Sequence, residues 1–272
     1  MGTPFKVFGI DFQKAFVCPG EPLCPAGAFE DVVRFSNFIT EAEEDIVDIF
    51  LTVDQHPIAH IGHPGWWLTS EGVSPEPFTL VNLLALESGA IQAADPKKQE
   101  YAKRYIDPIR GSMIWPVHCV PGTQSYELSN NLVAAVHSWE NSGPGRIATM
   151  AKKGYHQDLE SFGIFEPEYK GHGNILADFN DNLLGNLLFG NLPIVVGGEA
   201  RSHCVRCSVE QMVQRIQDYN LGFDLKKIVL LEDCMSDVTG YEEQGIRFLE
   251  NMAKQGCTVA TVESVLQGKV FG

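Results

Sequence analysis

Short apolar and β-branched runs recur along the chain, and each run leads into a polar or glycine-rich turn. Their length and composition are typical of β-strands rather than helices. The continuous apolar run of Ile194, Val195 and Val196 indicates a strand that is covered on both faces, as in a parallel sheet. The clearest predicted strands are residues 6–10, 45–53, 146–150, 193–197, 227–231 and 258–261.

Amphipathic stretches separate these runs. Residues 29–43, 204–218 and 241–255 each place their apolar side chains near one helical face. Strands that alternate with helices predict βαβ units, so we expect an α/β fold. The pattern predicts a doubly wound, Rossmann-like arrangement of three α/β/α layers around a mostly parallel six-stranded sheet.

The stretch between Pro57 and Trp115 breaks this rhythm. It contains further prolines and the adjacent Trp66 and Trp67. Long excursions inside a compact domain usually form a lid over a site or an oligomer contact. We therefore expect one domain over residues 1–272, with an irregular insertion at about residues 62–110.

The charge balance and the apolar pattern exclude some partners. The chain has 20 Lys and Arg residues and 35 Asp and Glu residues. The resulting net charge of −15 makes nucleic acid an unlikely partner. No apolar run is long enough for a membrane helix, and the N-terminus lacks a signal-peptide core, so we expect a cytoplasmic protein without a membrane partner. The seven cysteines are an odd number, which favours thiols in that compartment.

Chemically capable residues follow several of the predicted strands. Asp11 follows the first strand, Asp54 and His56 follow the second, Lys153 follows the third, and Cys204 follows the fourth. Ligands of open parallel sheets bind beyond the carboxyl ends of the strands. We therefore expect a carboxylate, a metal-type pair, an amine and a thiol along one edge of the sheet.

Cys204 follows a Gly-Gly turn and lies near the start of a predicted helix. Helix N-terminal N–H groups and a nearby ammonium favour a thiolate, and the same N–H groups could hold an oxyanion. Asp11 could take the thiol proton, and Lys153 could stabilise both anions. A buried structural cysteine, or a redox pair with Cys207 in a C-x-x-C arrangement, are the alternatives.

A second group of residues suits a metal ion. Asp54 and His56 lie two residues apart, so on an extended segment both side chains point the same way. His118 is a candidate third ligand, and His60 or His63 could be a fourth ligand or could orient the others. Carboxylate and imidazole ligands suit Zn²⁺ or Fe²⁺ better than Ca²⁺ or Mg²⁺. A single histidine is more often a structural or surface residue, so the evidence for a metal site is the whole group and not any one of its members.

Taken in chain order, these residues resemble the isochorismatase-like cysteine hydrolase superfamily, and specifically its nicotinamidase branch. The resemblance extends from Gly9 to about Val262. It rests on residues 11–13 with Phe16, 52–57 with His60, 115–123, 153–154, 198–205 and 231–234.

The resemblance implies a catalytic triad of Asp11, Lys153 and Cys204. It also implies an oxyanion hole formed by the main-chain N–H groups of Ala200 and Cys204, with a cis peptide between Glu199 and Ala200. The implied reaction is hydrolysis of a small amide through a cysteinyl thioester, with nicotinamide converted to nicotinate and ammonia. Such a reaction would belong to NAD salvage, and the family's habit suggests a homo-oligomer.

The resemblance further implies one divalent metal, with zinc expected first and iron or manganese as alternatives. The implied metal ligands are Asp54, His56 and His118. The implied substrate-binding residues are Phe16, Trp115, Phe162 and His203.

Some residues depart from the pattern of the nicotinamidase branch. Phe162 stands where the branch often has a tyrosine, and Glu160 adds a nearby carboxylate. The insertion is also longer than is typical. Because these changes affect specificity rather than catalysis, another small amide or a carbamoyl compound is an alternative substrate. A catalytically silent binding module is the other alternative.

Overall fold

The centre of this computed structural model, which describes residues 2–172 and 178–271, is a six-stranded sheet. Every pairing within the sheet is parallel. The expected α/β fold with a six-stranded parallel sheet is therefore confirmed. The strands are β1 (Phe5–Ile10), β2 (Ile46–Asp54), β7 (Thr149–Lys153), β8 (Ile194–Gly198), β9 (Ile228–Leu231) and β10 (Thr258–Ala260).

The spatial order of the strands is β10-β9-β8-β1-β2-β7. The chain builds outward from β1 through β2 to β7, and then returns to β8 on the other side of β1. This reversal creates a topological switch point between β1 and β8, where open α/β sheets bind their ligands. The register pairs Ile10 with Gly198 and Asp54 with Lys153, so the carboxyl ends of these four strands are level.

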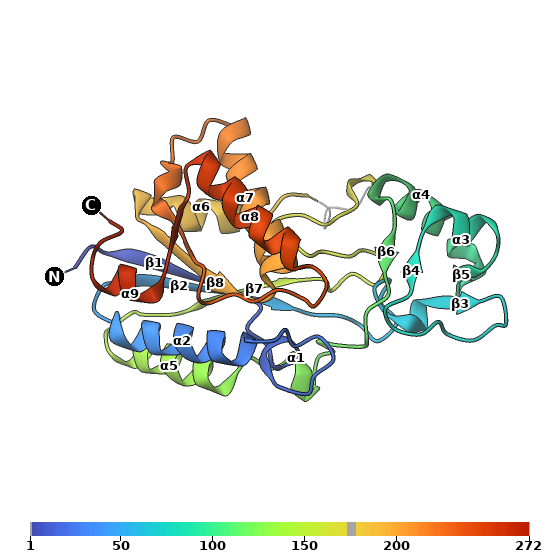
Figure 1. Ribbon diagram of the computed structural model, residues 1–272, viewed down its shortest axis with the longest axis horizontal. Coiled ribbons are helices and arrows are strands. Elements are labelled where there is room, and N and C mark those ends of the chain that lie inside the picture. The colour runs from blue at the N-terminus through green and yellow to red at the C-terminus, as the bar shows by residue number, and fades with distance from the viewer. Residues whose placement is uncertain (1, 173–177, 272) are drawn as a thin grey trace.

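Helices cover both faces of the sheet (Figure 1). One face carries α1 (Lys14–Val17), α2 (Ala28–Glu41), α5 (Asn130–Asn141) and α9 (Val262–Leu266). The other face carries α6 (Asp181–Leu188), α7 (Arg206–Asp218) and α8 (Glu242–Gln255). Successive side chains of β1 point to opposite faces of the sheet. Val7 belongs to the apolar cluster under α2, and Phe8 belongs to the cluster under α7.

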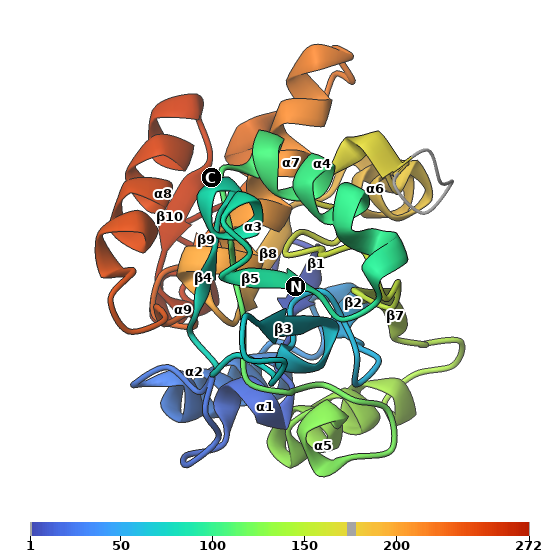
Figure 2. The same cartoon turned by 90° about the vertical axis from the view of Figure 1, so that its right-hand side faces the viewer.

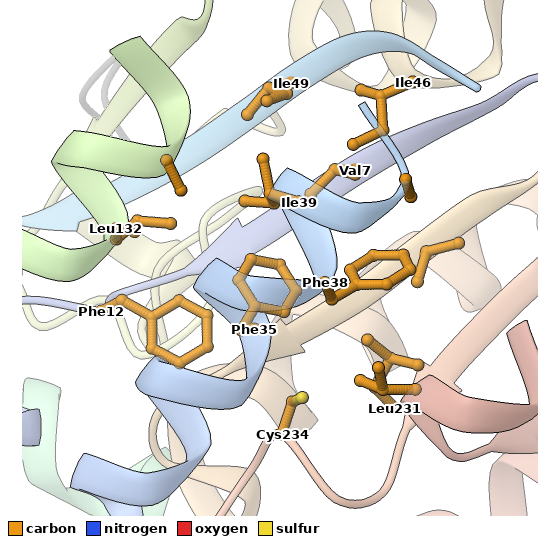
Figure 3. Close-up of a cluster of buried hydrophobic side chains, with 14 of the residues drawn as sticks. Val7, Phe12, Phe35, Phe38, Ile39, Ile46, Ile49, Leu132, Leu231 and Cys234 are labelled. Carbon is orange, nitrogen blue, oxygen red and sulfur yellow. The ribbon is translucent and has the colours of Figure 1, made fainter. Parts of the chain in front are cut away.

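The core beneath α2 depends on large aromatic side chains and on small residues in the sheet. Phe35 and Phe38 project from α2 into a buried cluster with Val7 and Leu132 (Figure 3). A Cβ on Gly197 would lie 2.7 Å from the Phe35 ring, so glycine at this position lets α2 pack closely on β8.

The insertion contains regular elements, whereas the sequence predicts irregular chain. Its strands form two antiparallel pairs, β3 with β5 and β4 with β6. They accompany α3 (Leu83–Glu87) and α4 (Gln99–Ile109) around a separate apolar cluster that includes Trp66, Trp67 and Tyr105. The strands are β3 (Trp67–Thr69), β4 (Leu80–Val81), β5 (Ile91–Ala93) and β6 (Ser112–Met113).

This unit lies beyond the carboxyl ends of the central strands (Figure 1). Viewed from that side, α3, α4, β3 and β5 lie in front of the sheet (Figure 2). The insertion is therefore placed to cover the edge where the candidate residues were expected. None of the described helices combines the length and the apolar character that crossing a membrane would require.

Candidate active site and metal centre

Lys153, the last residue of β7, is the charged centre of the site. Its side chain is buried, and its ammonium lies 3.0 Å from Asp11 Oδ2 and 3.2 Å from Asp54 Oδ1. The same ammonium lies 3.7 Å from Cys204 Sγ and donates a hydrogen bond to the Ser161 carbonyl. One buried cation therefore contacts two carboxylates and the thiol. The cation and its three partners come from the ends of four neighbouring strands.

Asp11 is held in place by Thr52 on the neighbouring strand. The Asp11 backbone is in the left-handed region, with φ of 51°. Its N–H donates to Thr52 Oγ1 at 3.0 Å, and the Thr52 hydroxyl donates to Asp11 Oδ1. These two bonds orient the second carboxylate oxygen toward Lys153.

Burial and charge act in opposite directions on these groups. Burial raises the pKa of Asp11, and the ammonium of Lys153 opposes that change. Burial likewise raises the pKa of the Cys204 thiol, and the Lys153 ammonium opposes this change while Asp11 adds to it. Burial alone would lower the pKa of Lys153, but Asp11 and Asp54 hold it well above its usual value. Lys153 therefore stays charged, while the thiol and the Asp11 carboxylate can exchange a proton beside it.

Cys204 lies on a π-helical turn, Arg201–Val205, between β8 and α7. The peptide bond between Glu199 and Ala200 is cis, as the sequence resemblance implies. The N–H groups of His203 and Val205 both donate to the Ala200 carbonyl and close the turn. Among the described residues, the Ala200 N–H has no hydrogen-bond acceptor, so it is available to a ligand oxygen.

Asp54, His56 and His118 form a compact group of metal-type ligand atoms. Asp54 Oδ2 lies 3.0 Å from His56 Nε2 and 3.8 Å from His118 Nε2. The Nδ1 atoms of the two rings face the carbonyls of Gly154 and Pro116, at 2.9 and 2.8 Å. Donation to these carbonyls places the ring proton on Nδ1 and leaves both Nε2 lone pairs for an ion.

The surroundings of this group fit a divalent metal. Burial disfavours charge on His56, yet Asp54 raises the pKa of His56 to about 9, so the site attracts positive charge. The Gln13 amide hydrogen-bonds both backbone groups of Asp54 and fixes this ligand. One carboxylate and two imidazoles form a donor set that suits Zn²⁺ or Fe²⁺.

His60 and His63 lie beside the metal-type group, and together with His56 they form a second set of possible ligands. Both ring nitrogens of His60 have backbone partners, a carbonyl for Nε2 and an N–H group for Nδ1. In His63, Nδ1 faces the Ile58 carbonyl and Nε2 lies 3.2 Å from His118 Nδ1. Each of the two histidines therefore stays a candidate for an additional ligand or for orienting the others.

The four expected substrate-binding residues line one cavity. Their rings contact one another or the metal-type group. The ring centroids of Phe16 and His118 lie 5.6 Å apart, and those of Trp115 and His203 lie 5.5 Å apart. Burial lowers the pKa of His203 to about 4, so this ring is a neutral wall. The cavity lining includes Phe16, Trp115, Phe162, His203, Ala200, Cys204, Asp54, His56 and His118, while Asp11 and Lys153 lie behind Cys204.

Known structures resemble this one, although no family model and no curated protein matches the sequence. A nicotinamidase and pyrazinamidase of Acinetobacter baumanii is 20% identical, with a TM-score of 0.62 over 96% of this chain and 97% of that one. The yeast nicotinamidase is 18% identical, with a TM-score of 0.65 over 94% and 98%. A Pyrococcus horikoshii pyrazinamidase in complex with zinc is 20% identical, with a TM-score of 0.54 over 94% and 98%.

The chain has the nicotinamidase fold. The sequence resemblance is thereby confirmed at the level of the fold. Within this fold, the residues expected to act together do come together at the carboxyl ends of β1, β2, β7 and β8.

Four contributors to this nicotinamidase-fold site were not assigned roles from the sequence. Thr52 and Gln13 orient the carboxylates, and Leu23 with Val238 completes the cavity wall. A signal for Thr52 existed, because Thr52 and Asp54 alternate along β2 and so face the same side. Leu23 and Val238 lie in loops without any periodic pattern, so no local signal indicates them.

The redox alternative receives no support from Cys207. This residue is buried and its thiol is free. Burial raises the pKa of Cys207 to about 12, whereas redox-active cysteines have lowered pKa values.

Gly154 predicts a sharp effect on metal binding. Its φ is +71°, and a Cβ would lie 2.4 Å from Asp54 Oδ1 and 2.5 Å from His56 Cε1. Because the two ligands would have to move apart, Gly154→Ala is expected to weaken zinc binding by at least about tenfold, as measured by competition with a chromogenic chelator.

Gly122→Ala is the matched control, since Gly122 has a φ of +83° but open space around its Cβ position. This variant shares the backbone strain and should bind zinc like the unmodified protein. Equal zinc affinity in the two variants would contradict the assignment of the metal centre.

Proposed function

We propose that the chain is a metal-assisted amidohydrolase that cleaves nicotinamide to nicotinate and ammonia through a cysteinyl thioester. The observation that carries this proposal is the contact of one buried ammonium, Lys153, with both Asp11 and Cys204. The adjacent metal-type group in the same cavity and the nicotinamidase fold support it. The yeast nicotinamidase is also known bound to the inhibitor nicotinaldehyde.

Acylation begins with proton transfer from the Cys204 thiol to the Asp11 carboxylate. The thiolate attacks the amide carbon, and the oxyanion accepts hydrogen bonds from the N–H groups of Ala200 and Cys204. The C–N bond then breaks as Asp11 returns the proton to the leaving nitrogen, which departs as ammonia. The product of this half-reaction is a thioester on Cys204.

Deacylation uses the same residues in reverse. Asp11 removes a proton from a water molecule, which attacks the thioester carbonyl. The C–S bond breaks to release the acid, and Asp11 returns the proton to the Cys204 sulfur. Lys153 keeps its proton throughout, because its pKa is held well above the usual value, and it stabilises both the thiolate and the carboxylate. Asp54, His56 and His118 would hold a divalent metal, which would supply an electrophilic site for a ring nitrogen of the substrate.

The aromatic rings around Cys204 suit a flat substrate. Phe16, Trp115 and Phe162 line the cavity, and the neutral His203 closes it. We further propose that the enzyme works in the cytoplasm, in NAD salvage, as a homo-oligomer. Size-exclusion chromatography with light scattering tests the last point, and a monomer would contradict it.

Ammonia release from nicotinamide, combined with metal analysis, tests the proposed function. We expect purified protein to contain about one divalent metal and to release ammonia and nicotinate in equal amounts. A chelator should lower the rate by at least about tenfold, and added Zn²⁺, Fe²⁺ or Mn²⁺ should restore it. Bound metal without ammonia release would point to another small amide, and absence of both would point to a binding module.

A further inference from the structure

A second cavity, of about 240 Å³, adjoins the one that contains Cys204. It lies where β4, β6 and α4 of the insertion face the central domain (Figure 1). Tyr105 of α4 lines it from the insertion, and Glu168 and Tyr241 line it from the opposite side. The two cavities share Trp115, Glu160, Phe162 and His203.

Three of the shared residues form an aromatic wall. The ring centroids of Trp115, Phe162 and His203 lie 5.5–6.3 Å apart in edge-to-face contacts. Tyr241 lines the second cavity but not the first, and its ring contacts the His203 ring with centroids 4.7 Å apart. A substituent on a substrate ring held at Cys204 would need to extend past one layer of side chains to enter the second cavity.

Two acidic side chains, Glu160 and Glu168, line this second cavity. Glu160 is 3% exposed, and its Oε1 accepts a hydrogen bond from the Ser161 N–H. Glu168 Oε1 has no hydrogen-bond partner in the described part of the chain. No lysine or arginine among residues 2–172 and 178–271 makes an ion pair with either acid, although Arg206 and Lys153 act on Glu168 from further away.

Such an arrangement is unfavourable unless a ligand completes it. Buried carboxylates with incomplete hydrogen bonding carry a desolvation cost. Burial and Glu160 raise the pKa of Glu168, while the Phe162 backbone, Arg206 and Lys153 oppose that change. Trp115, which is 6% exposed, also has an Nε1–H without a partner in the described residues. The Tyr105 hydroxyl is a third such group on the lining of this cavity. Buried polar atoms of this kind normally have partners, so three of them at one cavity indicate a polar ligand.

We propose that the second cavity binds a cationic group, an alkylammonium or a guanidinium. Glu160 and Glu168 supply the charge and hydrogen-bond acceptors, and the faces of Trp115, Phe162 and Tyr241 suit a cation. The inference rests on the proposed amidohydrolase function and narrows its substrates to small amides with a basic substituent. A free amine bound beside a simpler amide would present the same chemistry, and the test separates these two sources.

The test compares nicotinamides that carry either an aminomethyl or an ethyl group at ring position 4, 5 or 6. The two groups have nearly the same shape but differ in charge. For at least one position, the kcat/KM of the aminomethyl compound should exceed that of the ethyl compound by about tenfold or more. In Glu168→Gln, that ratio should fall to near one.

Glu166→Gln is the matched control. Glu166 lies two residues away, outside the second cavity, and its carboxylate pairs with Lys170 at 2.7 Å. This variant should keep both the aminomethyl preference and the rate with nicotinamide. A ratio near one at all three positions in the unmodified protein would overturn the proposal, as would an unchanged ratio in Glu168→Gln.

Binding to the Cys204→Ala variant separates this inference from the proposed function. Calorimetry should show tighter binding of an aminomethyl compound than of its ethyl partner, whether or not any amide is hydrolysed. Benzylamine tests the free-amine source: binding that Glu168→Gln abolishes supports a cation site occupied by a separate molecule. Equal binding of both members of every pair, with no benzylamine binding, would refute the cation site even if nicotinamide is hydrolysed.

Discussion

Replacing Cys204 by alanine is expected to lower kcat for ammonia release by at least about 10⁴-fold, because no other group in the cavity can form the thioester. Zinc content should stay the same, since the group of possible ligand atoms is formed by Asp54, His56 and His118 and does not include Cys204. Steady-state ammonia assays and elemental analysis measure the two effects.

Cys207→Ala is the control for this experiment. Cys207 is also buried and free, but it lies outside the cavity that Cys204 lines. Its replacement should change kcat by no more than a few-fold. Substantial turnover by Cys204→Ala would contradict the nucleophile assignment, and equal losses in both variants would indicate a shared structural effect.

Replacing Lys153 by methionine is expected to remove activity and stability together. The change leaves Asp11 and Asp54 buried without the ammonium that lies 3.0 and 3.2 Å from them. Breaking a buried ion pair in this way costs about 3–5 kcal/mol of unfolding free energy. We also expect kcat/KM to fall by at least about 10³-fold, because the thiolate loses its stabilising charge. Urea unfolding and ammonia assays measure the two losses.

Two further variants separate stability from catalysis at this position. Lys152→Met makes the same substitution at the neighbouring exposed residue and should change neither quantity appreciably. The double variant Asp11→Asn with Lys153→Met removes one of the stranded carboxylates, so it should regain part of the stability but none of the activity. Full activity in Lys153→Met would show that the ammonium has no role in the reaction.

Much of the candidate site could be predicted because its residues sit at strand ends. Asp11, Asp54, Lys153 and Cys204 each follow an apolar run, and parallel strands bring their carboxyl ends to one edge. The predicted third strand, residues 146–150, is displaced from β7 by three residues. Thr149 and Met150 are exposed on this edge strand, so its apolar signal is weak.

The insertion was harder to predict for a physical reason. Its prolines and short elements leave little periodicity within any window of sequence. Its core joins Trp66 and Trp67 to Tyr105 and Ile106, almost forty residues further along the chain. Contacts at such separations leave no local pattern, so regular elements appear only when the unit is assembled.

The sequence by itself determined the class of fold, the thiol, and the carboxylate, amine and imidazole groups that accompany it, because these follow from local pattern and residue chemistry. The tertiary structure decided the rest. It gave His60 and His63 different partners, since equivalent rings differ only in the groups that surround them. It also placed Glu168 beside Glu160 in a second cavity, because that meeting depends on how the insertion closes over the sheet.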